Sequence, residues 1–514
     1  MVDFAMSRRT LLRASALGVL TGPALAACGD GPGLVRARPT LTHGIAVGDP
    51  RSDGALIWAR SDRPATLVVE TAATEKFSDV RRFTGPLLTP ASDGTGRVRV
   101  NGLPAGQLVH YRVRLEGEDG ATSETLSGVF RTAPTAPADI SLVWSGDVAG
   151  QGFGINPDVG GMKVFATMAA RDPHLFLHSG DVIYADNALK ESVTLPDGRV
   201  WRNITADAKN QPAETLDQFR GNYAYNLTDE NYRRFNASVA QIVQWDDHET
   251  TNNWSPGGTV AADKGYTERN MDTLATRSWQ AFHEWMPLEP REAVDGRLYR
   301  KISYGPLLDV FVLDMRAYKD ANTANIGPQG QVLGAAQTAW LIDGLKQSTA
   351  TWKIVAADLP IGVVVPDGKT AFEGVANAAP GAPSGRESEI ALVLSAIKAN
   401  KVRDVVWLTA DVHYTAAHHY SPARANFTDF DEFWEFVSGP LNAGAFGPNP
   451  LDPTFGPEAV FVHAPPAPNT SPLDLEYQHF GEVRIDGGTG ELTVDLCDAT
   501  GKVLFSKQLP PSRK

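Results

Sequence analysis

Two patterns of apolar and polar positions divide the chain. Between residues 41 and 132, short segments such as 66–70 and 109–114 alternate apolar and polar side chains. Turn sequences, Asp53-Gly54 among them, separate these segments. Alternating strands at spacings of about 10–15 residues are typical of immunoglobulin or fibronectin sandwiches. We therefore predict a small all-β domain at residues 41–132.

After residue 138 the apolar positions form continuous runs. Helical spacing stands between several of the runs, at residues 162–170, 335–346 and 388–399. Continuous apolar runs indicate strands that are buried on both faces. The predicted strands are 140–144, 174–177, 239–243, 307–313, 354–357 and 405–408. We predict an α/β fold of layered sheets and helices over residues 138–510, with residues 477–508 completing the second sheet.

An aspartate follows each of these six strands, and a histidine or an arginine accompanies it in three cases. The residues are Asp147; Asp181; Asp247 with His248; Asp314 with Arg316; Asp358; and Asp411 with His413. One aspartate after a strand is best interpreted as a turn residue or helix cap. Six at the carboxyl ends of strands, where open α/β sheets bind ligands, indicate a shared site. Converging carboxylates repel one another unless a multivalent cation compensates them, so we predict a metal centre.

The ligand types favour a hard ion. Only His248 and His413 are histidines of these motifs, so the site is rich in oxygen, which suits Ca²⁺, Mg²⁺, Mn²⁺ or Fe³⁺. Tyr184 follows Asp181 by three residues, and a tyrosinate ligand would favour Fe³⁺. Taken alone, Tyr184 could equally be a packed aromatic side chain.

Composition narrows the function further. The 514 residues are 42% apolar and 21% charged, as in a globular protein. The net charge of −13 and the lack of a basic run argue against nucleic-acid binding as a function. Two cysteines exclude a disulfide scaffold. No apolar stretch outside the N-terminus is long enough to span a bilayer.

The first 27 residues have the features of an export signal. Arg8-Arg9 precede an apolar run that ends in small residues, as in a twin-arginine signal. Cys28 stands where a lipoprotein signal would place the lipidated cysteine. We expect export to the periplasm or cell surface, with a lipid on Cys28 or with plain cleavage before it.

The motifs resemble a known family. They are Gly146-Asp147, Gly180-Asp181-Val182-Ile183-Tyr184, Trp245-Asp246-Asp247-His248-Glu249, Leu313-Asp314-Met315-Arg316 and Asp411-Val412-His413. In order and spacing they resemble the alkaline phosphatase D (PhoD-like) family of calcineurin-like metallophosphoesterases. The resemblance implies a four-layer metallophosphoesterase sandwich, with helices on a two-sheet core, after the small all-β domain. It also implies secreted hydrolysis of phosphodiesters or phosphomonoesters with iron and calcium.

The resemblance assigns roles to individual residues. It places Asp147, Tyr184 and His413 at a first metal, Asp181 between two metals, and Asp247 and Asp411 at the second. His248 would contact the phosphate or protonate the leaving group, and Arg316 would clamp phosphate oxygens. Our own addition is Asp358, which could complete the second metal or cap the next segment.

One position departs from the family pattern and leaves the metals open. Many members have Ser-Cys where this chain has Ser145-Gly146, and that cysteine is an iron ligand. Here Asp147 follows instead, as in purple acid phosphatases. Fe³⁺ with Ca²⁺ is the expected pair, and Mn²⁺ or Ca²⁺ alone are the alternatives.

The expected reaction is attack on phosphorus by a metal-bridging hydroxide. The substrate would be a small phosphoester, such as a lipid headgroup or a wall polymer, and the protein a monomer.

If the insertions at 191–236 and 254–288 face the site, they would favour an apolar or planar leaving group. Two Gly/Pro-rich loops, 367–386 and 443–475, are expected to form a lid or wall.

Two other functions remain open from the sequence. The same metal site could serve a phospholipase D-like or phosphotriester hydrolase. A protein of another class, a calcium-binding surface lipoprotein without catalysis, would also need carboxylates but would have no use for His248 as an acid.

Overall fold

The computed structural model describes residues 38–288 and 297–512. The signal segment 1–27 and Cys28 lie outside the described residues. The described residues form one compact unit. Among the described residues, no helix has both the length and the apolar character that a membrane crossing requires.

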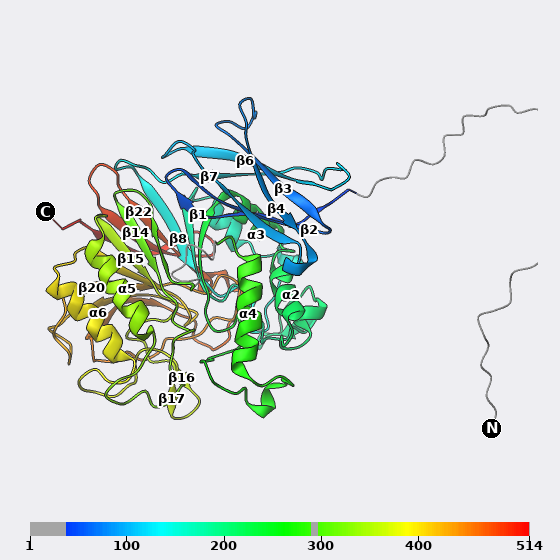
Figure 1. The fold of residues 1–514 in the computed structure, drawn as a ribbon. Helices are drawn as coiled ribbons and strands as arrows, with labels where there is room; N and C mark the ends of the chain where they lie inside the picture. The colour runs from blue at the N-terminus through cyan, green and yellow to red at the C-terminus, as the bar shows by residue number, and fades with distance from the viewer. Residues whose placement is uncertain (1–37, 289–296, 513–514) are drawn as a thin grey trace, which may run out of the picture. The chain divides into compact units, whose positions relative to one another are not determined.

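Two large sheets form the centre of this unit (Figure 1). The first has nine strands, in the order β24 (Val503–Leu509), β23 (Leu492–Asp498), β22 (His479–Ile485), β8 (Ile140–Ser145), β9 (Leu175–Ser179), β12 (Ala240–Gln244), β1 (Leu41–Arg51), β2 (Gly54–Ser61) and β5 (Thr95–Val100). The second has seven, in the order β13 (Arg300–Ser303), β14 (Leu308–Val312), β15 (Trp352–Ala356), β18 (Val405–Thr409), β20 (Phe433–Val437), β19 (Thr415–Tyr420) and β21 (Pro457–His463).

Parallel strands occupy the middle of each sheet. β8, β9, β12 and β1 run parallel in the first sheet, and β14, β15, β18 and β20 in the second. β22 pairs antiparallel with β8, so residues 477–508 extend the first sheet. The expectation that they complete the second sheet is wrong, because Gly481–Ile485 pair with the exposed edge of β8 rather than with β21.

Side chains alternate across each sheet and create three apolar layers. Leu142 and Leu177 of the first sheet pack between the sheets with Val310 and Leu408 of the second. Because successive strand residues face opposite sides, their neighbours point outward to the helices. The helices are α1 (Val164–Ala169), α2 (Leu216–Asn226), α3 (Glu230–Ser238), α4 (Met271–Trp285), α5 (Gly334–Gln347) and α6 (Glu387–Ala399).

The helices complete a four-layer sandwich, which confirms the predicted fold class. Residues of α1 to α4 pack with the outward side chains of the first sheet. Residues of α5 and α6 cover the second sheet, on the left in Figure 1. The two outer layers leave the carboxyl ends of the parallel strands as the open edge of the sandwich.

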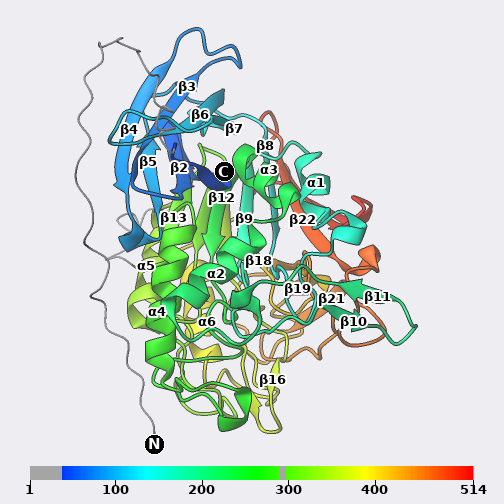
Figure 2. The same cartoon turned by 90° about the vertical axis from the view of Figure 1, so that its right-hand side faces the viewer.

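The segment 41–132 is β apart from one short 3₁₀ helix at Pro90–Ser92, and its strands divide between two sheets. β1, β2 and β5 belong to the nine-stranded sheet, where β1 pairs with β12 through Gly48 and Gln241. The remaining strands form their own sheet, seen at the top of Figure 2, in the order β4 (Arg81–Leu88), β3 (Ala65–Ala72), β6 (Leu108–Glu116) and β7 (Leu126–Arg131). The division of the chain at 41–132 and 138–510 stays a prediction.

Two short ribbons lie in the loops. One pairs β10 (Ser192–Thr194) with β11 (Val200–Arg202), within the insertion 191–236. The other pairs β16 (Pro366–Asp367) with β17 (Ala371–Phe372), within the loop 367–386 and the residue before it. Both belong to the loops that surround the carboxyl ends of the strands.

Candidate metal centre

The carboxyl ends of β8, β9, β12 and β18 bring the predicted ligands together. Asp147 follows β8, Asp181 follows β9, Asp247 follows β12, and Asp411 and His413 follow β18. All five side chains are buried except that of Asp411, which is partly exposed. The two sheets thus meet at one cluster, as the strand-end pattern predicts.

Four of these residues adopt a backbone conformation that side chains disfavour. The φ angles are 67° at Asp147, 48° at Asp181, 66° at Asp411 and 59° at His413. Left-handed residues other than glycine cost free energy and persist where the surrounding structure enforces them. At each of these strand ends the left-handed residue turns the backbone sharply, so that its side chain points toward the cluster.

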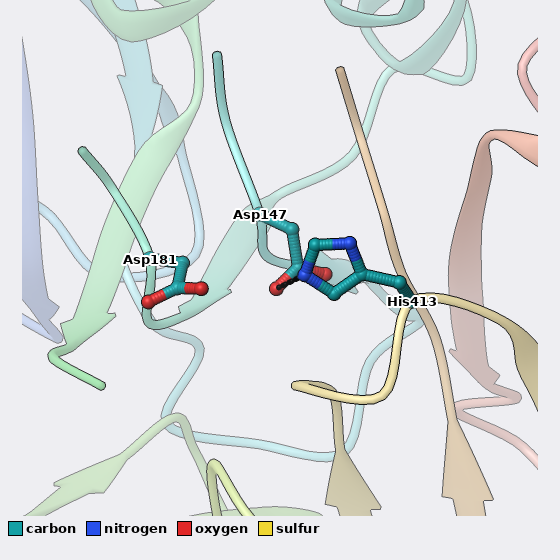
Figure 3. A group of neighbouring side chains, drawn as sticks. All are labelled: Asp147, Asp181 and His413. Carbon is teal, nitrogen blue, oxygen red and sulfur yellow. Dashed lines mark ion pairs between the residues drawn. The ribbon is translucent and has the colours of Figure 1, made fainter. Parts of the chain in front are cut away.

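The first ligand group comprises Asp147, Asp181 and His413, whose ligand atoms lie within 4.8 Å of one another (Figure 3). The Tyr184 hydroxyl lies 2.8 Å from His413 Nε2. His413 Nδ1 donates to the Gly444 carbonyl, so Nε2 is the nitrogen left for a metal. Burial lowers the pKa of His413 to about 4, which keeps the ring neutral, as a ligand must be.

Two further groups share residues with the first. Asp181, Asp247 and His248 form one, and Asp246, Asp247 and Asp411 form the other. Asp181 and Asp247 each belong to two groups. Asp181 therefore links the first two groups and Asp247 the second and third, while the assignment of these residues to a first and a second metal stays a prediction.

The cluster is built for a cation. Asp147 Oδ2 and Asp247 Oδ1 are buried and lack a hydrogen-bond partner among the described residues. Burial, reinforced by the neighbouring carboxylates, raises the pKa of Asp147 and of Asp181 well above the usual range. Metal ions would compensate this charge and satisfy the free oxygen atoms. The donor set thus fits metal binding, with oxygen atoms in the majority.

His248 stands at the edge of the cluster, oriented by a carboxylate. Its Nδ1 lies 2.7 Å from Asp186 Oδ1, and Asp186 Oδ2 accepts the backbone N–H of Asn252 at 2.9 Å. This leaves Nε2 on the cluster side, 4.0 Å from Asp247 Oδ1. Burial would lower the pKa of His248, but Asp186 and Asp247 outweigh it and raise the pKa to about 10. The two carboxylates thus favour the protonated form of the ring.

Arg316 lies inside the cluster rather than at its surface. Its side chain is fully buried and pairs with Asp246 and Glu373, and it also lies 3.1 Å from Asp411. The guanidinium therefore compensates carboxylates of this chain. The role of Arg316 as a phosphate clamp stays a prediction, because the structure pairs its guanidinium with carboxylates of this chain.

Asp358 also lies next to Arg316, with Oδ2 at 3.2 Å from its Nε. It is fully buried and belongs to none of the three ligand groups found among the described residues. The structure thus places Asp358 beside the guanidinium, and its part in the second metal site stays a prediction.

Sequence reasoning missed four residues of the site, and the first is Asp246, a member of the third ligand group. Asp186 follows Asp181 by five residues. The one signal in the sequence is that it is a second aspartate close to the motif that begins at Gly180. Glu249 accepts the N–H groups of Val182 and Asp246 and so joins two strand ends. Glu373 comes from the loop 367–386, and no motif marks it.

The cluster opens into a pocket of about 380 Å³. Asp181, Asp247, His248, Asp411 and His413 line it. Residues of both Gly/Pro-rich loops form its walls, among them Asp367, Gly368, Phe446 and Asn449. The loops thus border the site where the sequence placed a lid or wall.

Solved structures with the same fold define the class. A structure of PhoD superimposes with a TM-score of 0.66 over 92% of each chain, at 20% identity. The purple acid phosphatase PPD1 from yellow lupin (Lupinus luteus) seeds superimposes with a TM-score of 0.53 over 92% of this chain and 74% of its own, at 12% identity. Both structures share the fold of this chain.

The chain belongs to the PhoD-like phosphatase family, whose sequence profile matches residues 142–496. The profile of the N-terminal domain of PhoD-like phosphatases matches residues 28–134. Alkaline phosphatase D of Bacillus subtilis (strain 168) is 27% identical in an alignment over 441 residues that covers 79% of this chain and 70% of that protein. The protein is therefore a phosphoric ester hydrolase, and its reaction is metal-dependent.

Proposed function

We propose that the protein hydrolyses phosphodiesters and phosphomonoesters with His248 as the general acid. The observation that carries this proposal is the contact of Asp186 with His248 Nδ1, which leaves Nε2 at the cluster. A water oxygen forms a bond to phosphorus while the ester P–O bond breaks. The bonding electron pair goes to the leaving oxygen, which takes the proton of His248 Nε2, and the proton of the water passes to solvent.

We propose Fe³⁺ and Ca²⁺ as the metals, with Mn²⁺ or Ca²⁺ alone as alternatives. Asp147, Tyr184 and His413 would hold the first ion, Asp247 and Asp411 the second, and Asp181 both. When bound, the ions would neutralise the carboxylates, polarise the phosphoester and activate water. Asp147 supplies an oxygen where a thiolate would otherwise bind, which keeps the donor set hard.

Arg316 and Asp358 have a supporting part in this proposal. The guanidinium holds Asp246 and Asp411 in place and limits their mutual repulsion. Asp358 would balance the charge of the guanidinium from another strand. Arg316 would then position ligands rather than bind phosphate.

The direct test is to measure initial rates on bis(4-nitrophenyl) phosphate, 4-nitrophenyl phosphate and a 4-nitrophenyl triester, with and without a chelator. We expect chelator-sensitive turnover of the diester and the monoester, and none of the triester. His248→Gln should lower kcat by about 10²- to 10⁴-fold at unchanged metal content. Metal-loaded protein without any turnover, or an unchanged kcat in the variant, would contradict the proposal.

Tyr184 tests the metal assignment independently of activity. A phenolate bound to Fe³⁺ gives a charge-transfer band in the visible spectrum. The band should be present in the loaded protein and absent in Tyr184→Phe, with iron retained by elemental analysis. A colourless, iron-free and active protein would favour Mn²⁺ or Ca²⁺.

We also propose export by the twin-arginine route and a lipid on Cys28. The supports are Arg8-Arg9, the apolar run and the position of Cys28. Replacing Arg8-Arg9 by Lys-Lys should retain the protein in the cytoplasmic fraction. Cys28→Ser should move it from the membrane to the soluble envelope fraction, and an unchanged distribution would indicate plain cleavage.

A further inference from the structure

A second pocket, of about 500 Å³, adjoins the pocket of the metal centre. The two share the lining residues Gln151, His248, Asn252, Asn253 and Asp367. Asp181, Asp411 and His413 line only the first pocket, while Asp186, Trp254 and Tyr266 line only the second. His248 therefore stands at the boundary, with the carboxylate cluster on one side and a separate space on the other.

The walls of the second pocket differ in chemistry from those of the first. Trp254, Val260, Tyr266 and Met271 are buried and form an apolar wall on one side of a lining that is otherwise mostly polar. Within the described chain, the indole N–H of Trp254 has no hydrogen-bond partner. Lys264 lies exposed at the rim. A flat or apolar group would bury against this wall.

Two hydrogen bonds and a ring contact fix the position of the second pocket relative to the metal centre. The Asn253 backbone donates to Asp247, and its side chain donates to Asp367 at 3.1 Å. Trp254 packs edge-to-face on Trp245, at 5.5 Å between ring centroids. The turn that carries Asp247 and His248 therefore continues directly into the wall of the second pocket. A group bound there has a fixed position relative to His248 Nε2.

We propose that the second pocket binds the alcohol portion of the phosphoester, and that it selects esters whose leaving alcohol carries a flat ring or an apolar group. This inference rests on the proposed function. The phosphate would lie at the carboxylates, and the leaving oxygen must come within reach of His248. The remainder of the alcohol then has to extend past His248, which is where the second pocket begins.

Two neighbouring alanines allow a matched test. Ala261 lines the second pocket and is exposed, whereas Ala262 is exposed and outside the lining. Ala261→Trp should fill the pocket from its rim without disturbing the core, and Ala262→Trp adds the same side chain elsewhere. Equal melting temperatures of the two variants would establish that both fold.

The substrates vary one side of the phosphate at a time. Methyl 4-nitrophenyl phosphate and methyl 4-methylumbelliferyl phosphate have leaving groups of similar acidity and of one and two rings. Phenyl 4-nitrophenyl phosphate enlarges the other side only. In wild type, kcat/KM should be higher for the two-ring leaving group. Ala261→Trp should lower kcat/KM for that ester on the order of 10-fold more than for the one-ring ester. The phenyl-to-methyl ratio should not change.

The outcomes separate this inference from the proposed function. If Ala261→Trp behaves like Ala262→Trp on all three esters, the second pocket does not bind the leaving alcohol, although phosphoester hydrolysis stands. If the phenyl-to-methyl ratio changes instead, the pocket binds the non-leaving side and the inference is wrong. If metal-loaded wild type hydrolyses none of the esters, the proposed function fails first.

Discussion

Asp186 contacts Nδ1 of His248 and, in the proposed function, orients the ring. The Asp186→Asn variant keeps the shape but replaces a charged acceptor by a neutral amide. We expect kcat to fall about 10- to 100-fold, because the ring loses its orientation and the stabilisation of its protonated form. Steady-state kinetics with elemental analysis should give an altered kcat at unchanged metal content. The exposed Asp207→Asn is the control, and equal kcat values in both variants would refute the role of Asp186.

Gly439 shows how closely the backbone surrounds the first ligand group. A methyl group at this position would lie 2.1 Å from Asp147 Oδ2, which is nearer than atoms can approach. Gly439→Ala should therefore displace the Asp147 carboxylate and weaken the metal site that it serves. We expect loss of bound metal by elemental analysis. Gly488→Ala, where the nearest atom is 3.4 Å away, should retain the wild-type content. Full metal content in Gly439→Ala would contradict this.

Secondary-structure elements from distant parts of the chain depend on one buried ion pair. Asp49 of β1 accepts from Arg300 of β13 at 2.9 Å, and both side chains are 1% exposed. Arg300 also donates to the Val243 carbonyl of β12 at 3.0 Å. β1 and β12 are interior strands of the nine-stranded sheet and β13 is an edge strand of the seven-stranded sheet, so this pair links the two sheets.

Arg300→Met should therefore destabilise the fold by about 3–5 kcal/mol, because Asp49 remains as a buried charge without a partner. Adding Asp49→Asn should recover part of the loss, since the second substitution removes that charge. Urea unfolding midpoints of the single and double variants measure this. Arg234→Met removes an exposed pair with Glu230 and should change stability by less than about 1 kcal/mol. A double variant less stable than Arg300→Met would contradict the argument.

For the molecule as a whole, the sequence predicts those features that local pattern encodes. The apolar runs at 140–144 and 405–408 correspond to β8 and β18, because strands buried on both faces need apolar side chains at every position. The strand-end aspartates are predictable for a similar reason, since parallel strands align their carboxyl ends. Pairing between distant segments has no such signature. Gly48 and Gln241 give no sign that β1 joins β12, and nothing near Glu373 marks its contact with Arg316.

The charges of the metal site also affect the stability of the whole molecule. Asp147 and Asp181 are buried in one ligand group, and burial with the neighbouring carboxylates raises the pKa of both, so without metal their charges oppose folding. Chelation should therefore lower the melting temperature. Asp181→Asn removes one of these carboxylates while keeping its shape. In chelator it should raise the melting temperature, on the order of 1–3 °C, because it relieves repulsion.

In metal-loaded protein the same substitution should act in the opposite direction. Asp181 belongs to two ligand groups, so its loss weakens the binding that stabilises the folded state. Differential scanning fluorimetry of wild type and Asp181→Asn, each with and without chelator, measures both signs in one experiment. Asp263→Asn, at an exposed position, should shift neither melting temperature. If Asp181→Asn lowered the melting temperature under both conditions, Asp181 would be a structural residue whose charge the fold itself compensates, and the cluster would not depend on metal.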